Sequence, residues 1–409
     1  MNENFEQSNT AAQELTDVTQ YCFLGICIIN GLAGYAEDST LSTAMTRTVA
    51  KAIVYILVAI VLLYATAYKK KIRTDAFVVP VYWGLVHFNS FTKQGLGLVT
   101  LLILLLYFTF EQEKTAKILS YYEKWILIMA YMGIAAYIAN LLHIPLPHEY
   151  TSYYSRFNSE TTRYINYHFS YLYEYVGFSR LCGLFNEPGY FGTVIALILC
   201  VEQIDLKKRA NRVLLIAGIL TFSVAFLVII LLYLTLRYIK NIRLVFIILL
   251  IFVGAVYFVQ NIHFSNPTIE LQRLKIELLL HGSTLRTTRL FDSVFERWLS
   301  MGDHYFGYGE GYMASMLQND VAGSLSIKRI LVDQGFIGLM LAYIPLLLFS
   351  LRACQGNRDA IIYVTCYFLS LYQRPTWYNS IFVMLLFAGI DSIVERQAAI
   401  EATLEGEAE

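Results

Sequence analysis

The feature that most constrains this chain is the repetition of apolar runs of about 15–20 residues, each long enough to cross a bilayer as a helix. Only 15% of the 409 residues are charged, whereas a soluble chain carries about a quarter. Because lipid offers backbone polar groups no partners, the sequence predicts an all-α polytopic membrane protein. The runs lie near 19–35, 49–68, 75–91, 94–110, 124–144, 181–203, 213–237, 244–262, 335–352, 359–373 and 377–394.

Short basic loops predict the orientation of these runs, because Lys and Arg in short loops stay in the cytoplasm. With the basic loops inside, both termini are cytoplasmic and the two long loops are external. Residues 1–18 are polar and acidic, without the basic region of a cleavable signal peptide, so the first apolar run is expected to act as the targeting signal. The basic loops are 68–73, 113–117, 205–212, 237–243 and 351–358.

The run 213–237 conflicts with this orientation if it is a single span, because the basic loops on its two sides would then lie on opposite faces of the membrane. A turn at 221–226 keeps both loops inside and predicts two short, tilted or re-entrant helices that meet near Ser223. Each would be only about 18 Å long, against a hydrocarbon core of about 30 Å. The total is then about twelve membrane segments.

The predicted organisation has two large external loops between groups of spans. The second loop contains two predicted amphipathic helices, one after Pro267 and one at 287–301. The parts are a cytoplasmic tail 1–18, five spans in 19–144, a Tyr-rich external loop 145–180, central spans in 181–262, an external loop 263–334, C-terminal spans in 335–394 and a cytoplasmic tail 395–409.

The stretch RLCGLFNEPGYFG, 180–192, is unusual at the start of an apolar run. A helix that begins at 181 would carry Glu187 roughly 10 Å into the membrane, where an ionisable group costs a few kcal/mol. Pro188 either bends the helix or marks where it begins. We interpret the stretch as a polar cleft open to the outside. The alternative is a helix N-terminus, with Glu187 as an ordinary first-turn acid and Arg180 as an interfacial anchor.

Three arginines of the second external loop, Arg286, Arg289 and Arg297, lie opposite the apolar stripe of the predicted helix 287–301. A planar guanidinium group suits phosphate oxygens, so the cluster predicts a site for a lipid diphosphate that needs no metal ion. The alternative is a solvated face on which acidic neighbours neutralise the arginines. The glycine loop FGYGEGY that follows has no Walker lysine, so no nucleotide site is expected.

Arg374 lies in LYQRPTWYNS, 371–380, between the last two runs, where a functional role and an interfacial anchor are equally consistent. The tyrosines of 145–180 have a similar pair of interpretations, an aromatic belt or a platform for stacking sugars. The six cysteines show no metal-ligand spacing, so neither a disulfide framework nor a zinc site is expected.

Four motifs taken together resemble bacterial O-antigen polymerases of the Wzy type, within the superfamily that also contains O-antigen ligases. They cover roughly the second half of the chain, while the first five runs match only in character. Ligases usually carry a His-Asn pair shortly before the GFIG element, and NDVAGSLSIKRILVDQG has no histidine, which favours the polymerase. The motifs are RLCGLFNEPGYFG at 180–192, TFS at 221–223, FGYGEG at 306–311 and LVDQGFIGL at 331–339.

The resemblance implies a GT-C-like fold and glycosyl transfer on the periplasmic face of the bacterial inner membrane. The implied donor is a growing glycan on undecaprenyl diphosphate, and the implied acceptor is one lipid-linked repeat unit. No metal, other cofactor or nucleic acid is implied, and a chain-length regulator protein is an implied partner. Two alternatives stay open, an O-antigen ligase and a flippase for the same lipid-linked unit. The long external loop and the lack of a visible repeat count against the flippase.

For this reaction we expect Glu187 to be the catalytic base, because burial near an apolar helix would raise its pKa, with His304 in reserve. The expected diphosphate-binding residues are Arg180, Arg286 and Arg289, with Arg297 and Arg374 as weaker candidates. The expected glycan contacts are Asn186, Tyr190 and Tyr308.

Overall fold

The computed structural model forms two compact units, and each is described here by itself. The first comprises 1–125, 344–360 and 377–409, and the second comprises 126–343 and 361–376. All four motifs that carry the resemblance lie in the second unit. The structure describes residues 22, 25, 53, 56, 59–60, 112–155, 160–175, 178–185, 187–241, 243–244, 246–247, 250, 253–254, 257, 289–301, 304–309, 312–316, 327–373 and 380–406.

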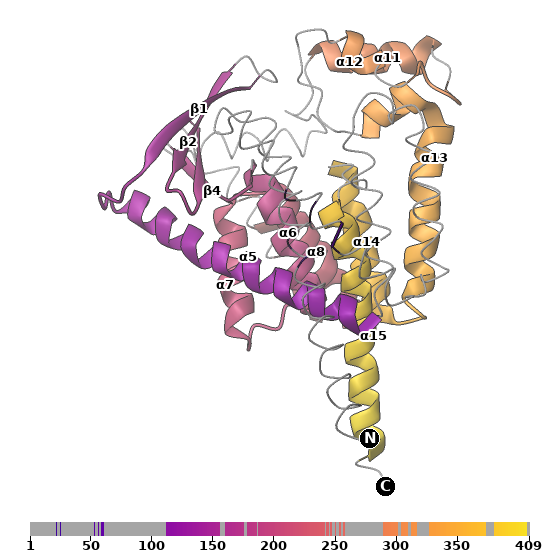
Figure 1. Cartoon of the computed structure of the whole chain (residues 1–409). Coiled ribbons are helices and arrows are strands. Elements are labelled where there is room, and N and C mark those ends of the chain that lie inside the picture. The colour runs from indigo at the N-terminus through magenta and orange to yellow at the C-terminus, as the bar shows by residue number, and fades with distance from the viewer. Residues whose placement is uncertain are drawn as a thin grey trace. The chain divides into compact units, whose positions relative to one another are not determined.

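Much of the Tyr-rich segment folds as an antiparallel sheet, which the sequence analysis did not predict (Figure 1). Tyrosine and β-branched residues favour strands, and Tyr171 and Tyr173 have the period of two that places side chains on one face. His168, at φ 66°, lies in the turn between the second and third strands, and its N–H donates to Asn166 Oδ1 at 2.7 Å. The strands are β1 (Glu149–Ser155), β2 (Glu160–Asn166), β3 (Tyr171–Tyr175) and β4 (Phe178–Gly183), in the order β1-β2-β3-β4.

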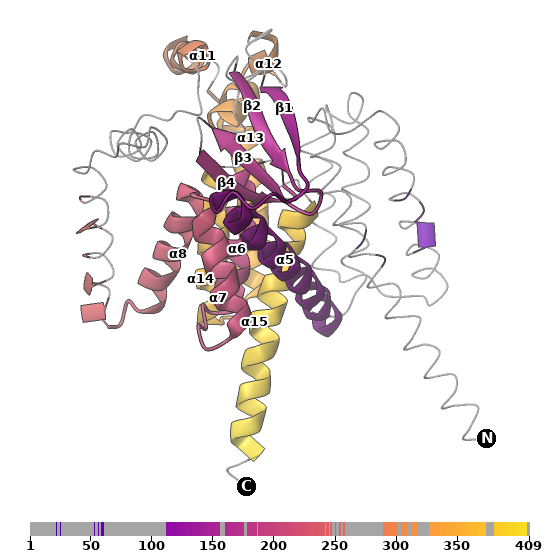
Figure 2. The ribbon, with the colours of Figure 1, turned by 90° about the vertical axis from the view of Figure 1, so that its left-hand side faces the viewer.

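One face of the sheet packs on helix α5 (Gln112–Leu141), which begins in the first unit and continues into the second (Figure 2). Register partners Leu172 and Leu181 are fully buried on this face. A Cβ at Gly133 of α5 would lie 2.6 Å from Leu181 Cδ1, so the helix and strand approach closely where the glycine allows it. Asn140 of α5 adds a hydrogen bond, since its Nδ2 donates to Ser179 Oγ at 2.9 Å.

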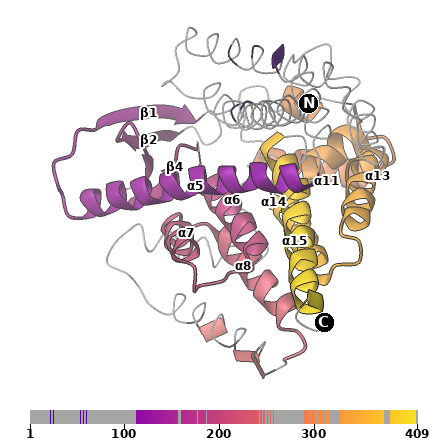
Figure 3. The same ribbon diagram turned by 60° about the horizontal axis from the view of Figure 1, so that its bottom comes forward.

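Three short helices follow the sheet: α6 (Pro188–Val201), α7 (Arg209–Leu220) and α8 (Val224–Arg237). Helix α6 is buried along almost its whole length and packs against both α7 and α8 (Figure 3). Between α7 and α8 the chain turns at 221–223, so the helix break predicted near Ser223 is confirmed. The Ser223 side chain caps α8, since its Oγ accepts the Phe226 N–H at 3.4 Å.

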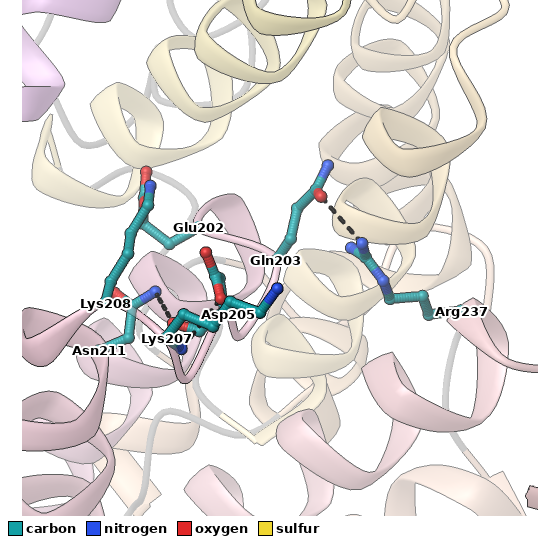
Figure 4. Close-up of polar contacts among 7 residues, drawn as sticks. All are labelled: Glu202, Gln203, Asp205, Lys207, Lys208, Asn211 and Arg237. Carbon is teal, nitrogen blue, oxygen red and sulfur yellow. Dashed lines mark hydrogen bonds and ion pairs between the residues drawn. The ribbon is translucent and has the colours of Figure 1, made fainter.

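Polar contacts tie together the far ends of these three helices (Figure 4). Arg237, at the end of α8, donates from Nη2 to Gln203 Oε1 at 2.8 Å, just after α6, and from Nη1 to Tyr233 Oη at 2.7 Å. Asn211 of α7 donates from Nδ2 to the Asp205 carbonyl oxygen at 3.0 Å. The loop before α7 and the loop after α8 therefore lie at the same end, as the turn at 221–223 predicts.

Helix α11 (Arg289–Met301) confirms the amphipathic helix predicted at 287–301. Its apolar side chains pack on a short helix, α12 (Tyr312–Met316), and on the first part of α13 (Ile327–Ala353). Phe291, Trp298, Met313 and Val332 form the buried centre of this cluster. The other amphipathic helix, predicted after Pro267, lies outside the described residues.

Helix α13 bends at Gly335, whose φ of 66° and ψ of −169° are not helical (Figure 1). The last two helices are α14 (Arg358–Gln373) and α15 (Ser380–Gly406). Within the first unit, Asp391 of α15 is buried, and its Oδ2 accepts a hydrogen bond from Thr115 Oγ1 of α5 at 2.5 Å. A buried carboxylate needs such hydrogen bonds, because burial without them is costly.

The predicted all-α, GT-C-like fold with about twelve membrane segments is wrong. The described residues include a four-stranded sheet and two helices that are long and apolar enough to cross a membrane, Thr115–Leu141 and Ile327–Ala353. Residues 181–183, read as the start of a span, belong to β4, and α6 of 14 residues is about 21 Å long, shorter than a core of about 30 Å. The predicted runs in 75–110 lie outside the described residues.

Candidate functional site

The motif 180–192 changes from strand to helix in its middle. Strand β4 ends at Gly183, which has a φ of 60°, and the Phe185 N–H donates to the Cys182 carbonyl oxygen at 3.1 Å in the turn that follows. Pro188 is the first residue of α6, where its missing N–H costs nothing. Of the two roles considered for this proline, it therefore marks where the helix begins.

Glu187 is the N-cap residue of α6 and is exposed to solvent. The expectation that it lies two turns inside a membrane helix is therefore wrong, because the helix starts only after it. The expectation of a raised pKa depended on burial of this carboxyl group, so that argument fails as well. A carboxylate at a helix N-terminus is favoured by the helix dipole, which agrees with the alternative interpretation of this residue.

Arg180 holds the turn between α7 and α8. Its Nε donates to the Thr221 carbonyl oxygen and its Nη2 to the Phe222 carbonyl oxygen, each at 3.0 Å. The last carbonyls of a helix have no partner within the helix, and a cation is favoured there. The half-buried guanidinium also lies 5.9 Å from the centre of the Tyr173 ring, its register partner on β3. At least part of the hydrogen-bonding capacity of Arg180 thus serves the fold.

A second contact joins the motif 180–192 to the turn at 221–223. A Cβ added at Gly192 would lie 2.7 Å from Thr221 Oγ1 and 2.9 Å from Ser223 Cβ, so only glycine allows α6 to approach the turn this closely. The motifs 180–192 and 221–223 are therefore packed against each other through Arg180 at the start of the first motif and Gly192 at its end.

Aromatic rings lie near Arg180, and two of them are on the face of the sheet opposite α5. Tyr164 and Tyr173 are register partners whose ring centres lie 5.5 Å apart, edge to face. Tyr190, expected to contact glycan, stacks on Phe185 at 5.1 Å, so one face of its ring is already covered. Burial raises the pKa of the Cys182 thiol, while the positive charge of Arg180 acts in the opposite direction.

Two backbone hydrogen bonds join the other two motifs, and two more join LVDQGFIGL to His304 and Tyr305, just before FGYGEG. The N–H groups of Tyr308 and Gly309 donate to the carbonyls of Val332 and Asp333 at 2.8 and 2.9 Å. The N–H groups of Phe336 and Ile337 donate to the carbonyls of His304 and Tyr305 at 2.8 and 3.0 Å. We call this contact between 304–309 and 332–337 the loop junction.

Two glycines with positive φ make the loop junction sterically possible. A Cβ at Gly307 would lie 2.6 Å from the Gly335 nitrogen, and a Cβ at Gly335 would lie 2.3 Å from the Tyr305 carbonyl oxygen. Both contacts are with backbone atoms, which cannot move away as a side chain can. Gly307 of FGYGEG and Gly335 of LVDQGFIGL are thus explained by close packing of the two backbones.

His304, the reserve catalytic candidate, caps the end of α11. Its Nε2 lies 3.0 Å from the carbonyl oxygens of both Trp298 and Leu299, so this nitrogen carries the proton and donates it. The imidazole also packs edge to face on the Trp298 ring, with centres 5.0 Å apart. Hydrogen bonding at Nε2 therefore favours a structural role for His304.

Asp333 is a residue whose part in the loop junction the sequence analysis missed. The residue is 5% exposed, and Oδ1 accepts the Met313 N–H at 2.8 Å while Oδ2 lies 3.5 Å from Arg329 Nε. The available signal was a lone acidic residue in the mostly apolar motif LVDQGFIGL.

The remaining predicted site residues are distributed as follows. Arg297 is exposed on α11, and the Tyr308 ring packs on Tyr312 with centres 4.5 Å apart. Arg289 is the first residue of α11, and its side chain lies outside the described part of the structure. Asn186, Arg286 and Arg374 also lie outside it. Among the residues that are described, His, Cys, Asp and Glu form no group of three or more that could hold a metal ion.

Comparison with known proteins does not add a relative. No protein-family model, curated protein or solved structure matches the chain.

Proposed function

We propose that this chain is a membrane glycosyltransferase that joins lipid-diphosphate-linked oligosaccharide units into a surface polysaccharide, as O-antigen polymerases of the Wzy type do. The observation that carries the proposal is that the four motifs of the resemblance contact each other in two pairs. Arg180 and Gly192 join the first motif to the turn at 221–223, and the loop junction joins the other two.

The chemistry needs few catalytic groups, because a diphosphate is already a good leaving group. The protein must stabilise the negative charge that develops on the diphosphate and must orient an acceptor hydroxyl. Exposed Arg297 is the described residue best suited to the first task, with Arg286 and Arg289 beside it in sequence. Exposed Glu187 is accessible to an acceptor and is assigned the second task.

Arg180 has a different role in this proposal. Because its guanidinium holds the carbonyls of the turn at 221–223, we assign it to positioning the segment that carries Glu187. A lysine there has one compact ammonium group and cannot reproduce the two donors of a planar fork. Arg180→Lys is therefore expected to lower transfer substantially. At an arginine that acts only by its charge, replacement by lysine should retain part of the transfer.

The membrane location of the proposal is supported by the two apolar helices that could act as spans. The proposed site faces the periplasm of a bacterial inner membrane, where lipid-linked units are available and nucleotide sugars are not.

The first test compares surface lipopolysaccharide on gels from a strain that lacks only this gene, with and without the gene restored. We expect a band with a single repeat unit and loss of the ladder of longer chains, both reversed on restoration. Loss of the single-unit band as well would indicate ligation or flipping and would overturn the proposal.

The second test measures transfer by purified protein from a lipid-diphosphate-linked repeat unit. Arg297→Ala is expected to reduce product formation, and Arg212→Ala, an exposed arginine of α7, is the matched control that is expected to retain it. Full turnover by Glu187→Gln would remove the role assigned to that carboxylate.

A further inference from the structure

Six apolar side chains are exposed together near the loop junction. They lie on segments that are hydrogen-bonded to one another, because His304 Nε2 donates to the Leu299 carbonyl oxygen and the backbones of 304–305 and 336–337 are hydrogen-bonded. Met301, Tyr305 and Phe306 expose 76%, 70% and 67% of their surface, far more than core residues of this size. We call this set the apolar tip: Leu299, Met301, Tyr305, Phe306, Phe336 and Ile337.

The apolar tip is distinct from the apolar stripe of α11. Phe291 and Trp298 of that stripe are fully buried against Met313 and Val332, with Phe295 partly buried beside them. The stripe is therefore already occupied by the protein's own core. The tip lies at the end of α11, on the loop that follows and just after Gly335 of α13, where the Phe336 ring borders the buried Trp298 ring with centres 5.9 Å apart.

The tip continues the exposed apolar face of a candidate membrane span. One turn after Phe336 and Ile337, Met340 and Leu341 are 55% and 48% exposed on α13. In a helix that crosses a bilayer, exposed apolar side chains of this kind contact lipid. Because the tip joins this face directly, the same lipid surface is available to it.

The types of residue in the tip and around it fit the boundary between lipid and water. Aromatic residues are enriched at that boundary, and the tip has Tyr305, Phe306 and Phe336. Exposed polar residues of α11, Ser293 and Glu296, lie outside the tip. An amphipathic surface of this kind lies with its apolar side about 5–10 Å into the boundary between headgroups and acyl chains.

We infer that the apolar tip is a membrane-docking surface, with the lipid bilayer as its partner. It fixes the end of α11 and the loop junction at the membrane surface, next to the point where α13 enters the bilayer. The inference requires α13 to be a span and does not depend on the proposed reaction.

The test introduces a tryptophan into the full chain reconstituted in phospholipid vesicles. Phe306→Trp and Tyr305→Trp exchange one aromatic ring for another and so preserve the fold, and Ser293→Trp on exposed α11 surface is the matched control. The tryptophan emission of each variant in excess of wild type is measured in vesicles with and without bromine near the headgroup end of the acyl chains. It is also measured with and without iodide in the water.

We expect the added emission of Phe306→Trp and Tyr305→Trp to be quenched by brominated lipid and shifted to the blue relative to Ser293→Trp. The control should be quenched by iodide and unaffected by bromine. Quenching of the tip variants by iodide alone would mean that the tip lies in water. Quenching by neither would mean that protein covers it, and each of these two results would overturn the inference.

Discussion

Replacing Gly335 by alanine should open the loop junction. With a φ of 66° and a ψ of −169°, this position lies in a region that is essentially restricted to glycine, and a residue with a Cβ loses about 1–3 kcal/mol there. The new Cβ would also lie 2.3 Å from the Tyr305 carbonyl oxygen and 2.6 Å from the Phe306 nitrogen. Relief of this clash requires the two backbones to separate.

Separation breaks the four backbone hydrogen bonds of the loop junction, each with a net value of about 0.5–1.5 kcal/mol. These bonds are lost on opening in wild type and variant alike, so the strain of about 1–3 kcal/mol in the closed junction is what changes the opening equilibrium. Since about 1.4 kcal/mol is a factor of ten, local opening should become roughly five- to a hundredfold more frequent.

Hydrogen exchange followed by mass spectrometry on the full chain in lipid measures this opening at the amides of Tyr308, Gly309, Phe336 and Ile337. Gly309→Ala is the matched control, because its φ of 98° brings backbone strain but no atom lies within 4 Å of the added Cβ. We expect much faster exchange in Gly335→Ala than in Gly309→Ala. Equal protection of the junction in Gly335→Ala and wild type would refute the reasoning.

Two further predictions concern stability and reactivity. Ser223→Ala removes the acceptor for the Phe226 N–H and should lower the free energy of unfolding by about 1 kcal/mol in detergent, whereas Ser223→Asn should retain most of it. Burial raises the pKa of Cys354 to about 12 from its usual 9.0, so the thiol should alkylate slowly at pH 8 in the folded chain and quickly in denaturant. The part of the free energy of unfolding that comes from keeping this thiol protonated is complete below pH 9.0 and is lost as the pH rises towards 12. Equal labelling of the folded and the denatured chain would contradict the raised pKa.

Elements whose formation depends mainly on neighbouring residues were predicted correctly from the sequence. The helix of 287–301 followed from apolar spacing, and the break near Ser223 followed from the conflict between two basic loops. The sheet was missed because tyrosines near a predicted membrane suit an interfacial belt as well as a strand. The twelve-segment fold failed partly because hydropathy does not show that a helix starts at Pro188 rather than at 181.

The site was less predictable, since its contacts join residues far apart in sequence. Arg180 was identified as a key residue, but its partners at Thr221 and Phe222 lie 41 and 42 positions later and are backbone carbonyls, which any residue carries. Asp333 likewise accepts the N–H of Met313, which lies 20 positions earlier in the chain.

The order of the elements also has a consequence during synthesis. Each strand pairs with the next one in sequence, so the sheet can be complete soon after Gly183 leaves the ribosome. Arg180 can then already be fixed on β4 before Thr221 and Phe222, 41 and 42 positions later, leave the ribosome. The sheet can therefore already be folded when the α7–α8 turn forms. Arg180, from the part of the chain that was translated first, then fixes the geometry of that turn.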